Sequence, residues 1–231
     1  MMKILAIETS TKNFSLAVAD GNKILRSRNV VLKNVLSSSI IPSIKKILDA
    51  SSLSLKQIDG FTIGLGPGSF TSLRVGLATV KAFGFATGKP VVGIPSLDVL
   101  AMNLVPERPG VICSLCDAKR NLVYACCYLS FGGKLRRKTP YLLTPIEDLL
   151  KNIDGEASFL GDAVDLYRDR IEDRATKNHN FKPFFADAKK RFPLAKNLIP
   201  LAWERFEKKK ADPVDKLVPL YLYPHDCQIR K

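Results

Sequence analysis

The sequence predicts an α/β fold made of two lobes, and three observations carry this prediction. Three apolar segments follow one another at the start of the chain, separated by turn residues. Extended and helical segments then alternate up to about residue 98. A second run of strands followed by helices starts near residue 111. It repeats the outline of the first, although no repeat is visible at the level of individual residues.

The first lobe opens with three predicted strands. An apolar run covers residues 3–9, and Phe14, Leu16 and Val18 then alternate with smaller residues, which is the two-residue period of a strand. The tight turn at Asp20-Gly21 predicts that the chain returns as a third strand over residues 23–30.

Helices and short buried strands alternate after this point. Serines at 37–39 are N-cap candidates for a helix that ends near residue 50, and a short strand covers residues 60–65. A longer helix runs from about residue 70 to residue 87, where Gly88 and then Pro90 end it. The next strand spans residues 90–94, and another helix follows Pro95-Ser96.

The second half begins with strands predicted at residues 111–117, 123–131 and 134–143, with Gly132-Gly133 turning the second hairpin. A helix capped at residues 144–147, a strand at 158–161 and a helix from about residue 163 follow. Residues 173–193 are basic and weakly patterned, so we expect a surface connection there. Residues 200–210 are predicted to form the last helix.

The composition is that of an ordinary globular protein, with 231 residues of which 46% are hydrophobic and 25% are charged. No apolar run approaches the roughly 18 residues that a membrane span needs. The acid at position 8 comes too early for the apolar region of a signal peptide. We therefore expect a cytoplasmic protein without membrane association.

The five cysteines agree with that compartment, because an odd number argues against a disulfide framework. Cys113 and Cys116 have the C-x-x-C spacing, but residues three apart in a strand point to opposite faces. The two histidines form no H-x-x-x-H pair. Buried, inert thiols are therefore favoured over a structural zinc site, and no metal site is predicted.

The net charge of +14 is high, and it is spread over both halves of the chain rather than gathered in a tail. A generally basic surface suits a polyanion or an acidic partner. Simple solubility, or a host whose proteins are basic, explains the same excess equally well.

A first candidate site lies where the first strand ends. Hydroxyls and turn amides there can cradle a phosphate, and a carboxylate can hold magnesium through water. Turn chemistry alone accounts for the same residue types. The residues of this weak nucleotide- or anion-binding signal are Glu8, Thr9, Ser10 and Thr11.

A second part of this site is the glycine-rich segment at residues 64–74. Glycines after a strand, followed by a hydroxyl at a helix start, make an anion pocket from backbone N–H groups, and this assigns Gly66, Gly68 and Ser69. The segment lacks the lysine of a Walker loop and the three-glycine spacing of a Rossmann fingerprint. A tight connection that needs positive φ angles is the simpler alternative.

The helix predicted after this loop is apolar nearly all round, which indicates burial on most sides. Small side chains at i, i+4 spacing form a ridge that lets another helix approach closely. We expect a partner protein to pack on one face of this helix. The alternative is that other segments of the same chain cover both of its faces. The candidate interface comprises Ile40, Ile44, Leu48, Leu73, Gly76, Leu77, Ala78, Val80, Ala82, Gly84 and Ala86.

No catalytic residue is predicted. The chain has only two histidines, and neither belongs to a Ser/His/Asp or Cys/His arrangement or to a glycine elbow. Asp117 ends a strand where a carboxylate could serve catalysis or hold magnesium. We favour its other role, as the cap of the turn at residues 119–121.

These motifs together resemble one known family. Residues 4–11 (ILAIETST) are similar to its opening I-L-A-I-D-T-S-T, and residues 66–74 (GPGSFTSLR) to its G-P-G-S-F-T-G-[LV]-R signature. Residues 93–97 (GIPSL), 117–120 (DAKR) and 219–222 (PLYL) resemble its later motifs. The matches are in order, span most of the chain and are dense over residues 1–125. The family is TsaB (YeaZ).

The resemblance implies an actin-like (ASKHA, ribonuclease H-like) two-lobe α/β fold with a degenerate second lobe. We expect residues 1–98 to form the first lobe, with the segment 213–231 returning to it. Residues 99–212 would then form the second, smaller lobe.

The resemblance also implies a non-catalytic subunit. Such a subunit pairs with the related catalytic subunit TsaD, mainly through helices of the first lobe, and with the ATPase TsaE. The complex transfers threonylcarbamoyl to adenosine 37 of ANN-decoding tRNAs. The H-x-x-x-H metal pair of the catalytic relative is missing here. No cofactor is firmly implied: ATP with magnesium, and tRNA, would enter at the level of the complex. The free chain is expected to form a homodimer.

An independent ATP-dependent small-molecule kinase of the same fold group is the alternative function, since function resides in sites and not in architecture. A peptidase would need a nucleophile or metal pair that is not visible, and direct tRNA binding rests on the charge alone. Two departures from the family pattern matter. Glu8 replaces the usual Asp, which lengthens any metal-holding arm, and Tyr223 replaces an Arg.

Overall fold

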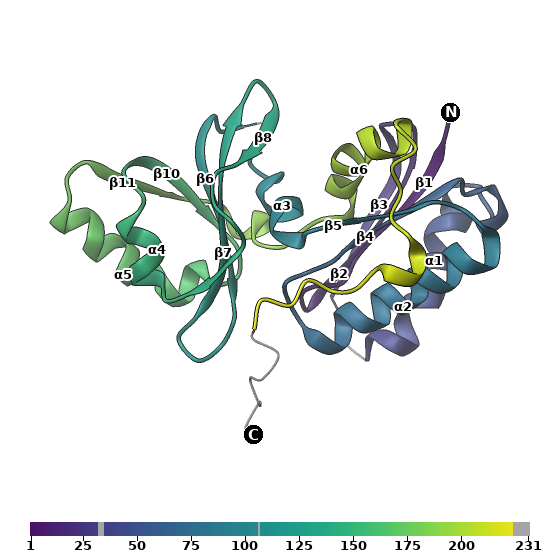
Figure 1. Ribbon diagram of the computed structural model, residues 1–231, viewed down its shortest axis with the longest axis horizontal. Helices are drawn as coiled ribbons and strands as arrows, with labels where there is room; N and C mark the ends of the chain where they lie inside the picture. Colours follow the sequence, from purple (N-terminus) through teal and green to yellow (C-terminus); the bar gives the residue numbers. More distant parts are fainter. Residues whose placement is uncertain (32–34, 106, 224–231) are drawn as a thin grey trace. The chain divides into compact units, whose positions relative to one another are not determined.

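The computed structural model describes residues 1–31, 35–105 and 107–223, and these form two compact units (Figure 1). The first unit contains residues 1–99 and 192–219. The second contains residues 100–191 and 220–223. The expected second lobe, residues 99–212, is thus corrected for residues 99 and 192–212, because the helix in the latter segment packs on the first sheet. The expected return of residues 213–231 to the first lobe is confirmed for 213–219 and wrong for 220–223, and residues 224–231 lie outside the described part of the chain.

The first unit is built on a five-stranded sheet with the order β3-β2-β1-β4-β5. The three opening strands are antiparallel neighbours, as predicted, whereas β4 and β5 add in parallel on the other side of β1. Parallel neighbours need crossover connections, which the two long helices provide. The strands are β1 (Lys3–Glu8), β2 (Asn13–Asp20), β3 (Lys23–Val31), β4 (Gly60–Gly64) and β5 (Val91–Ile94).

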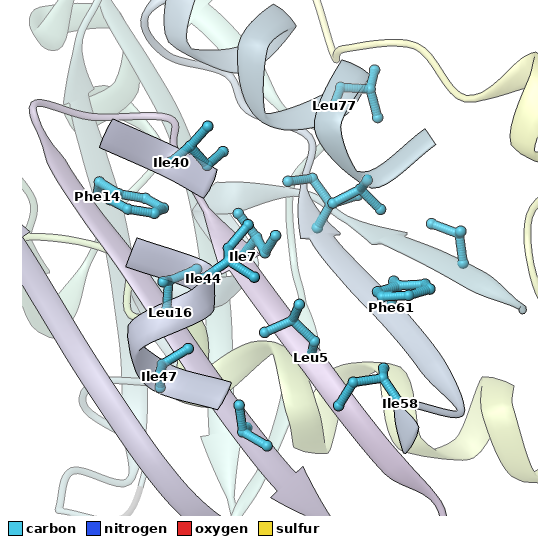
Figure 2. Close-up of a cluster of buried hydrophobic side chains, with 14 of the residues drawn as sticks. Leu5, Ile7, Phe14, Leu16, Ile40, Ile44, Ile47, Ile58, Phe61 and Leu77 are labelled. Atoms are coloured by element: carbon cyan, nitrogen blue, oxygen red, sulfur yellow. The ribbon is translucent and has the colours of Figure 1, made fainter. Parts of the chain in front are cut away.

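Helices cover both faces of this sheet. One face carries α1 (Leu36–Ala50) and α2 (Phe70–Thr87), and the other carries α3 (Ser96–Ala101) and α6 (Leu198–Glu207). Leu5 and Ile7 of β1 face one helical layer, and Ile4 and Ala6 face the other, so the strand is apolar from Ile4 to Ile7. Figure 2 shows one layer, in which Leu5 and Ile7 of the sheet lie under the helix residue Ile44.

The second unit has its own sheet, in the order β11-β10-β6-β7-β8, with β9 paired to β7. Its helices α4 (Ile146–Lys151) and α5 (Val164–Lys177) pack on one face, around Phe159 and Ile171. The strands are β6 (Gly110–Asp117), β7 (Val123–Phe131), β8 (Lys134–Arg137), β9 (Leu142–Thr144), β10 (Gly155–Leu160) and β11 (Phe181–Phe185). Short 3₁₀ turns occur at Leu55–Gln57, Ala188–Lys190, Ala195–Asn197 and Val214–Lys216.

Three expectations for local structure are wrong. The predicted strand at residues 134–143 is split into β8 and β9, since Pro140 cannot donate to a ladder. Residues 173–193 are not merely a surface connection, because α5 continues to Lys177 and β11 pairs in parallel with β10. The N-cap of α1 is Val35, and the hydroxyls of Ser38 and Ser39 donate back to its carbonyl.

Helix length and polarity bear on membrane insertion. In the part of the chain that the structure describes, no helix combines the length and the apolar character that a membrane crossing requires.

Candidate functional site

The carboxylate of Glu8, at the end of β1, is completely buried and engaged on both oxygens. Oε1 accepts a hydrogen bond from the backbone N–H of Ser10 at 2.7 Å, and Oε2 accepts one from the hydroxyl of Ser96 at 2.9 Å. The Ser96 oxygen in turn accepts from the N–H of Gly66 at 3.0 Å. The strand end, the glycine loop and the start of α3 therefore share one buried polar network.

Burial raises the pKa of Glu8, because desolvation destabilises the charged carboxylate by more than the hydrogen bonds from Ser10 and Ser96 stabilise it. With both oxygens bonded inside its own unit, the side chain holds the surrounding loops together.

Close packing explains the glycines around this carboxylate. A Cβ atom at Gly64 would lie 2.0 Å from Oε2 of Glu8, and one at Gly68 would lie 2.1 Å from the carbonyl oxygen of Ser10. A Cβ at Gly76 of α2 would lie 2.3 Å from Oγ1 of Thr9. These contacts leave no room for a side chain, so the glycines allow β1, the loop and α2 to meet.

The residues of the predicted anion site do come together in the first unit. Thr9, Ser10 and Thr11 are buried in the turn after β1, and the N–H of Ser69 donates to the carbonyl of Ser10 at 2.7 Å. Gly66 and Gly68 lie in the same loop as Ser69. Binding of an anion or nucleotide at this place stays a prediction. The contribution of Ser96 was missed, since nothing local in the sequence connects it with Glu8.

The outer face of α2 carries the predicted ridge of small side chains. Ala78, Ala82 and Ala86 are all exposed, and they lie on one stripe because they are four residues apart. Phe85, beside this stripe, is 64% exposed, and Phe70 at the start of the helix is 49% exposed. The helix ends at Gly88 in the left-handed conformation, as its sequence predicted.

The remaining residues of the predicted interface do not lie on the surface, and this part of the prediction is corrected. Gly76 packs on Thr9, and Gly84 faces Val91 and Val214. The C-terminal segment covers this side of α2, where Lys81 donates to the carbonyl of Asp215 at 2.9 Å. The other residues of the predicted interface are also buried in the first unit, namely Ile40, Ile44, Leu48, Leu73, Leu77 and Val80.

Sequence reasoning overlooked one exposed apolar residue of the neighbouring helix. Ile41 of α1 is 52% exposed, although Ile40 and Ile44 next to it are buried. Ile41 falls outside the helical spacing of Ile40, Ile44 and Leu48, and this apolar residue off the buried stripe was the sequence signal for its exposure.

In the second unit, Asp117 caps a turn as expected. Its Oδ1 accepts from the N–H of Lys119 at 2.8 Å, and the residues at 119–121 all have positive φ. The N–H of Asp117 donates to Asp162, whose pKa is raised because burial desolvates it. Tyr223 donates from its hydroxyl to the carbonyl of Ala118 at 2.7 Å, which gives this departure from the family pattern a structural role.

The cysteines face different layers, as the strand spacing predicted. Cys113 lies on the helix-covered face of the second sheet, opposite Cys127, whereas Cys116 pairs with Tyr124 in the register. Within the described residues, no three His, Cys, Asp or Glu side chains gather as metal ligands would.

Comparison with known proteins gives this geometry a context. A family model described as TsaD, tRNA N6-adenosine threonylcarbamoyltransferase, matches residues 32–230. The tRNA threonylcarbamoyladenosine biosynthesis protein TsaB of Bacillus subtilis is 29% identical over 224 residues, covering 96% of this chain and 94% of the relative. The TsaB protein of Escherichia coli is 24% identical over 226 residues, with the same coverage.

Solved structures agree on the fold. The structure of YeaZ from Pseudomonas aeruginosa has a TM-score of 0.80 and 24% sequence identity, and the match covers 96% of this chain and 100% of that one. The expected actin-like, ribonuclease H-like fold is thereby confirmed. The chain belongs to the family of the TsaD model, tRNA N6-adenosine threonylcarbamoyltransferase, and within it resembles the TsaB (YeaZ) proteins over nearly its full length.

Proposed function

We propose that this chain is a non-catalytic subunit of the complex that transfers threonylcarbamoyl to adenosine 37 of ANN-decoding tRNAs. In this role it binds a TsaD-type catalytic subunit and supports its activity. The names of the Bacillus subtilis and Escherichia coli relatives, both TsaB proteins of threonylcarbamoyladenosine biosynthesis, support the assignment to this modification.

The exposed face of α2 is the observation that carries the proposal. Three exposed alanines on one stripe, next to an exposed phenylalanine, offer a helix surface that a second helix can approach closely. A surface of this kind is typical of protein contacts, because small side chains bring the two backbones together and the aromatic ring supplies apolar area. The contact surface is therefore proposed around Ala78, Ala82, Phe85 and Ala86.

The absence of independent catalysis is supported by the two carboxylates at strand ends. Glu8 is buried and bonded to Ser10 and Ser96, and Asp117 accepts from the N–H of Lys119. Both are occupied in positioning their own loops. We therefore assign both side chains to the local structure of their loops rather than to the turnover of a nucleotide.

The other partners follow from the same role. A TsaE-type ATPase, tRNA, and ATP with magnesium would meet this chain within the assembled complex, in the cytoplasm. The residues gathered at 8–11, where the first strand ends, and in the loop at 66–69 would contribute to nucleotide binding there. Without its partner, the chain would use the exposed face of α2 to form a homodimer.

Reconstitution tests the proposal. The TsaD-type and TsaE-type proteins of the same host are incubated with tRNA, ATP and the threonylcarbamoyl donor, with and without this chain. We expect modified adenosine only when the chain is present, and no ATP turnover by the chain alone. Full modification in its absence would contradict the proposed role. Hydrolysis of ATP by the purified chain would favour an independent kinase.

A further inference from the structure

Two cysteines of the second unit face each other across neighbouring strands. In the antiparallel register of β6 and β7, Cys113 lies directly opposite Cys127, and their sulfur atoms are 3.1 Å apart. Directly opposite residues of an antiparallel pair have Cα atoms about 4.5–5.5 Å apart, which is within the roughly 4.4–6.8 Å that a disulfide spans. A bond between the two sulfurs therefore needs no rearrangement of the strands.

The two thiols differ in access. Cys113 is fully buried in the core beneath the helices, whereas Cys127 lines a pocket of 380 Å³. The wall of this pocket also includes Lys138, Thr139 and Asp148, from the segment after β8 and from α4. A small polar molecule in the pocket would therefore lie beside Cys127, whereas Cys113 is not among the residues that line it.

The surroundings also make the two thiols chemically unequal. The hydrogen bond from Cys113 lowers the pKa of Cys127 by more than burial raises it, and the charge of Lys138 adds to the lowering. The same hydrogen bond, together with burial, raises the pKa of Cys113. Because the thiolate is the nucleophilic form, Cys127 is the thiol prepared for attack. The N–H of Lys138 donates to the carbonyl of Cys127 at 2.8 Å and keeps the two residues together.

We propose that Cys127 and Cys113 form an oxidisable thiol pair that reacts with hydroperoxides through this pocket. The Cys127 thiolate attacks the terminal oxygen of the hydroperoxide, the O–O bond breaks, and a sulfenic acid forms. The alkoxide leaves with the thiol proton as an alcohol, or as water when the oxidant is hydrogen peroxide. Cys113 then attacks the sulfenic sulfur, and the hydroxyl leaves as water with the Cys113 proton.

This sequence of steps balances, since both thiols together lose the two electrons that one hydroperoxide gains. The product is a disulfide between Cys113 and Cys127 that ties β6 to β7. The pairing across the strands, together with the pocket, sets Cys113 and Cys127 apart from the inert buried thiols that the sequence favours. The inference does not depend on the proposed complex.

The neighbouring cysteines provide matched controls. Cys126 is on β7 next to Cys127, but it faces Ser114 in the register, and Cys116 faces Tyr124. Both are buried, but on the other face of the sheet, so they are cysteines of the same strands that lack an opposing thiol. The variant Cys126→Ser should therefore leave the reaction unchanged.

The test is oxidation of the full-length protein with hydrogen peroxide, followed by alkylation, digestion and disulfide mapping by mass spectrometry. We expect a Cys113–Cys127 link as the main product in the wild type and in Cys126→Ser. In Cys113→Ser, Cys127 should stop at the sulfenic acid and react with a dimedone probe. In Cys127→Ser, Cys113 should stay reduced. Replacing Lys138 by Met should slow oxidation, by about threefold for each unit by which the thiol pKa rises.

The proposal is overturned if the folded wild type forms no Cys113–Cys127 link at peroxide levels that oxidise glutathione. It is also overturned if Cys113 of the Cys127→Ser variant is oxidised as fast as in the wild type. Should the serine variants fail to fold, the mapping in the wild type and the rate in Lys138→Met still decide the question.

Discussion

The hydroxyl of Ser96 donates a hydrogen bond of 2.9 Å to Oε2 of Glu8, which lies 88 positions earlier in the sequence. Because the same hydroxyl oxygen accepts from Gly66, one side chain joins the end of β1, the glycine loop and the start of α3. In such a buried network, the loss of one member leaves the others without partners. The stability of the first unit should therefore respond strongly to changes here.

Replacing Ser96 by Ala removes a donor to Glu8 and an acceptor for Gly66. We expect a loss of roughly 2–4 kcal/mol in the free energy of unfolding, because two buried polar groups lose a bond. Urea denaturation measures this loss. The control Ser38→Ala, an exposed serine of α1, should change the free energy by less than about 0.5 kcal/mol. Equal effects of the two variants would show that the buried network contributes nothing.

The raised pKa of Glu8 predicts a specific pH dependence. The ordinary pKa of a glutamate carboxyl is 4.5, and the folded chain raises this value for Glu8. Between pH 4.5 and the folded-state pKa, the folded chain therefore keeps the carboxyl proton that the unfolded chain has lost. The resulting stabilisation is complete below 4.5 and is lost as the pH rises through the folded-state pKa. The variant Glu8→Gln has no such titration. The free energy of unfolding of Glu8→Gln, relative to the wild type, should therefore increase between pH 4.5 and the folded-state pKa.

Denaturation curves for both proteins, recorded from below pH 4.5 up to neutral pH, provide the check. A relative stability that does not change with pH, or that falls as the pH rises, is incompatible with a raised pKa at Glu8.

The contact between Gly76 and Thr9 predicts coupled substitutions. Gly76→Ala should destabilise the protein by about 1–3 kcal/mol, because the new Cβ would lie 2.3 Å from Oγ1 of Thr9. Thr9→Ala removes that atom, which has no hydrogen-bond partner within the described residues. The double variant should regain at least about 1 kcal/mol over the sum of the single changes.

A matched cycle uses Gly60→Ala with Thr9→Ala. The closest atom to a Cβ at Gly60 is the flexible end of Met2, and Thr9 is not among its neighbours. These two substitutions should be additive within about 0.5 kcal/mol. If the effects of Gly76→Ala and Thr9→Ala are additive as well, the close contact between α2 and the turn after β1 does not limit the stability of the protein.

The attachment of α6 to the first sheet depends on Asp212. Its Oδ1 accepts from Arg205 of α6 at 2.6 Å, and its Oδ2 accepts from the N–H of Gly93 in β5 at 2.8 Å. Both charged side chains are partly exposed, so we expect Asp212→Ala to cost about 1–3 kcal/mol in thermal or urea unfolding. Asp215→Ala, an exposed acid nearby, should have little effect. A comparable loss in both variants would point to net charge instead of this bonding pattern.

Local sequence signals predicted the elements whose form depends on near neighbours. The alternation at Phe14, Leu16 and Val18 gave a strand, and Gly88 marked the end of α2, because a two-residue period and a left-handed helix end are encoded within a few residues. The residues of the predicted anion site meet because strand ends and their following turns cluster at one edge of a sheet.

Contacts between distant segments were out of reach of such signals. Burial of one side of α2 depends on Val214 and on a bond from Lys81 to a carbonyl 134 residues away. The edge strand β11 exists because β10 offers it a partner, although Pro183 weakens its own strand signal. For the same reason, the division of the predicted interface into exposed alanines and buried aliphatic residues became clear only from the packing.

The central claim is that the exposed face of α2 binds a related catalytic protein, and Ala82→Glu tests it most directly. The exposed position tolerates the charge in the free chain, but a closely packed helix would bury it without a partner. Ala188→Glu makes the same change at an exposed alanine of the second unit. Titration calorimetry with the TsaD-type subunit of the host measures both affinities.

The account predicts a loss of affinity of about 100-fold or more for Ala82→Glu, equivalent to roughly 3 kcal/mol, and wild-type affinity for Ala188→Glu. A correctly folded Ala82→Glu variant that binds the TsaD-type subunit as tightly as the wild type would contradict it.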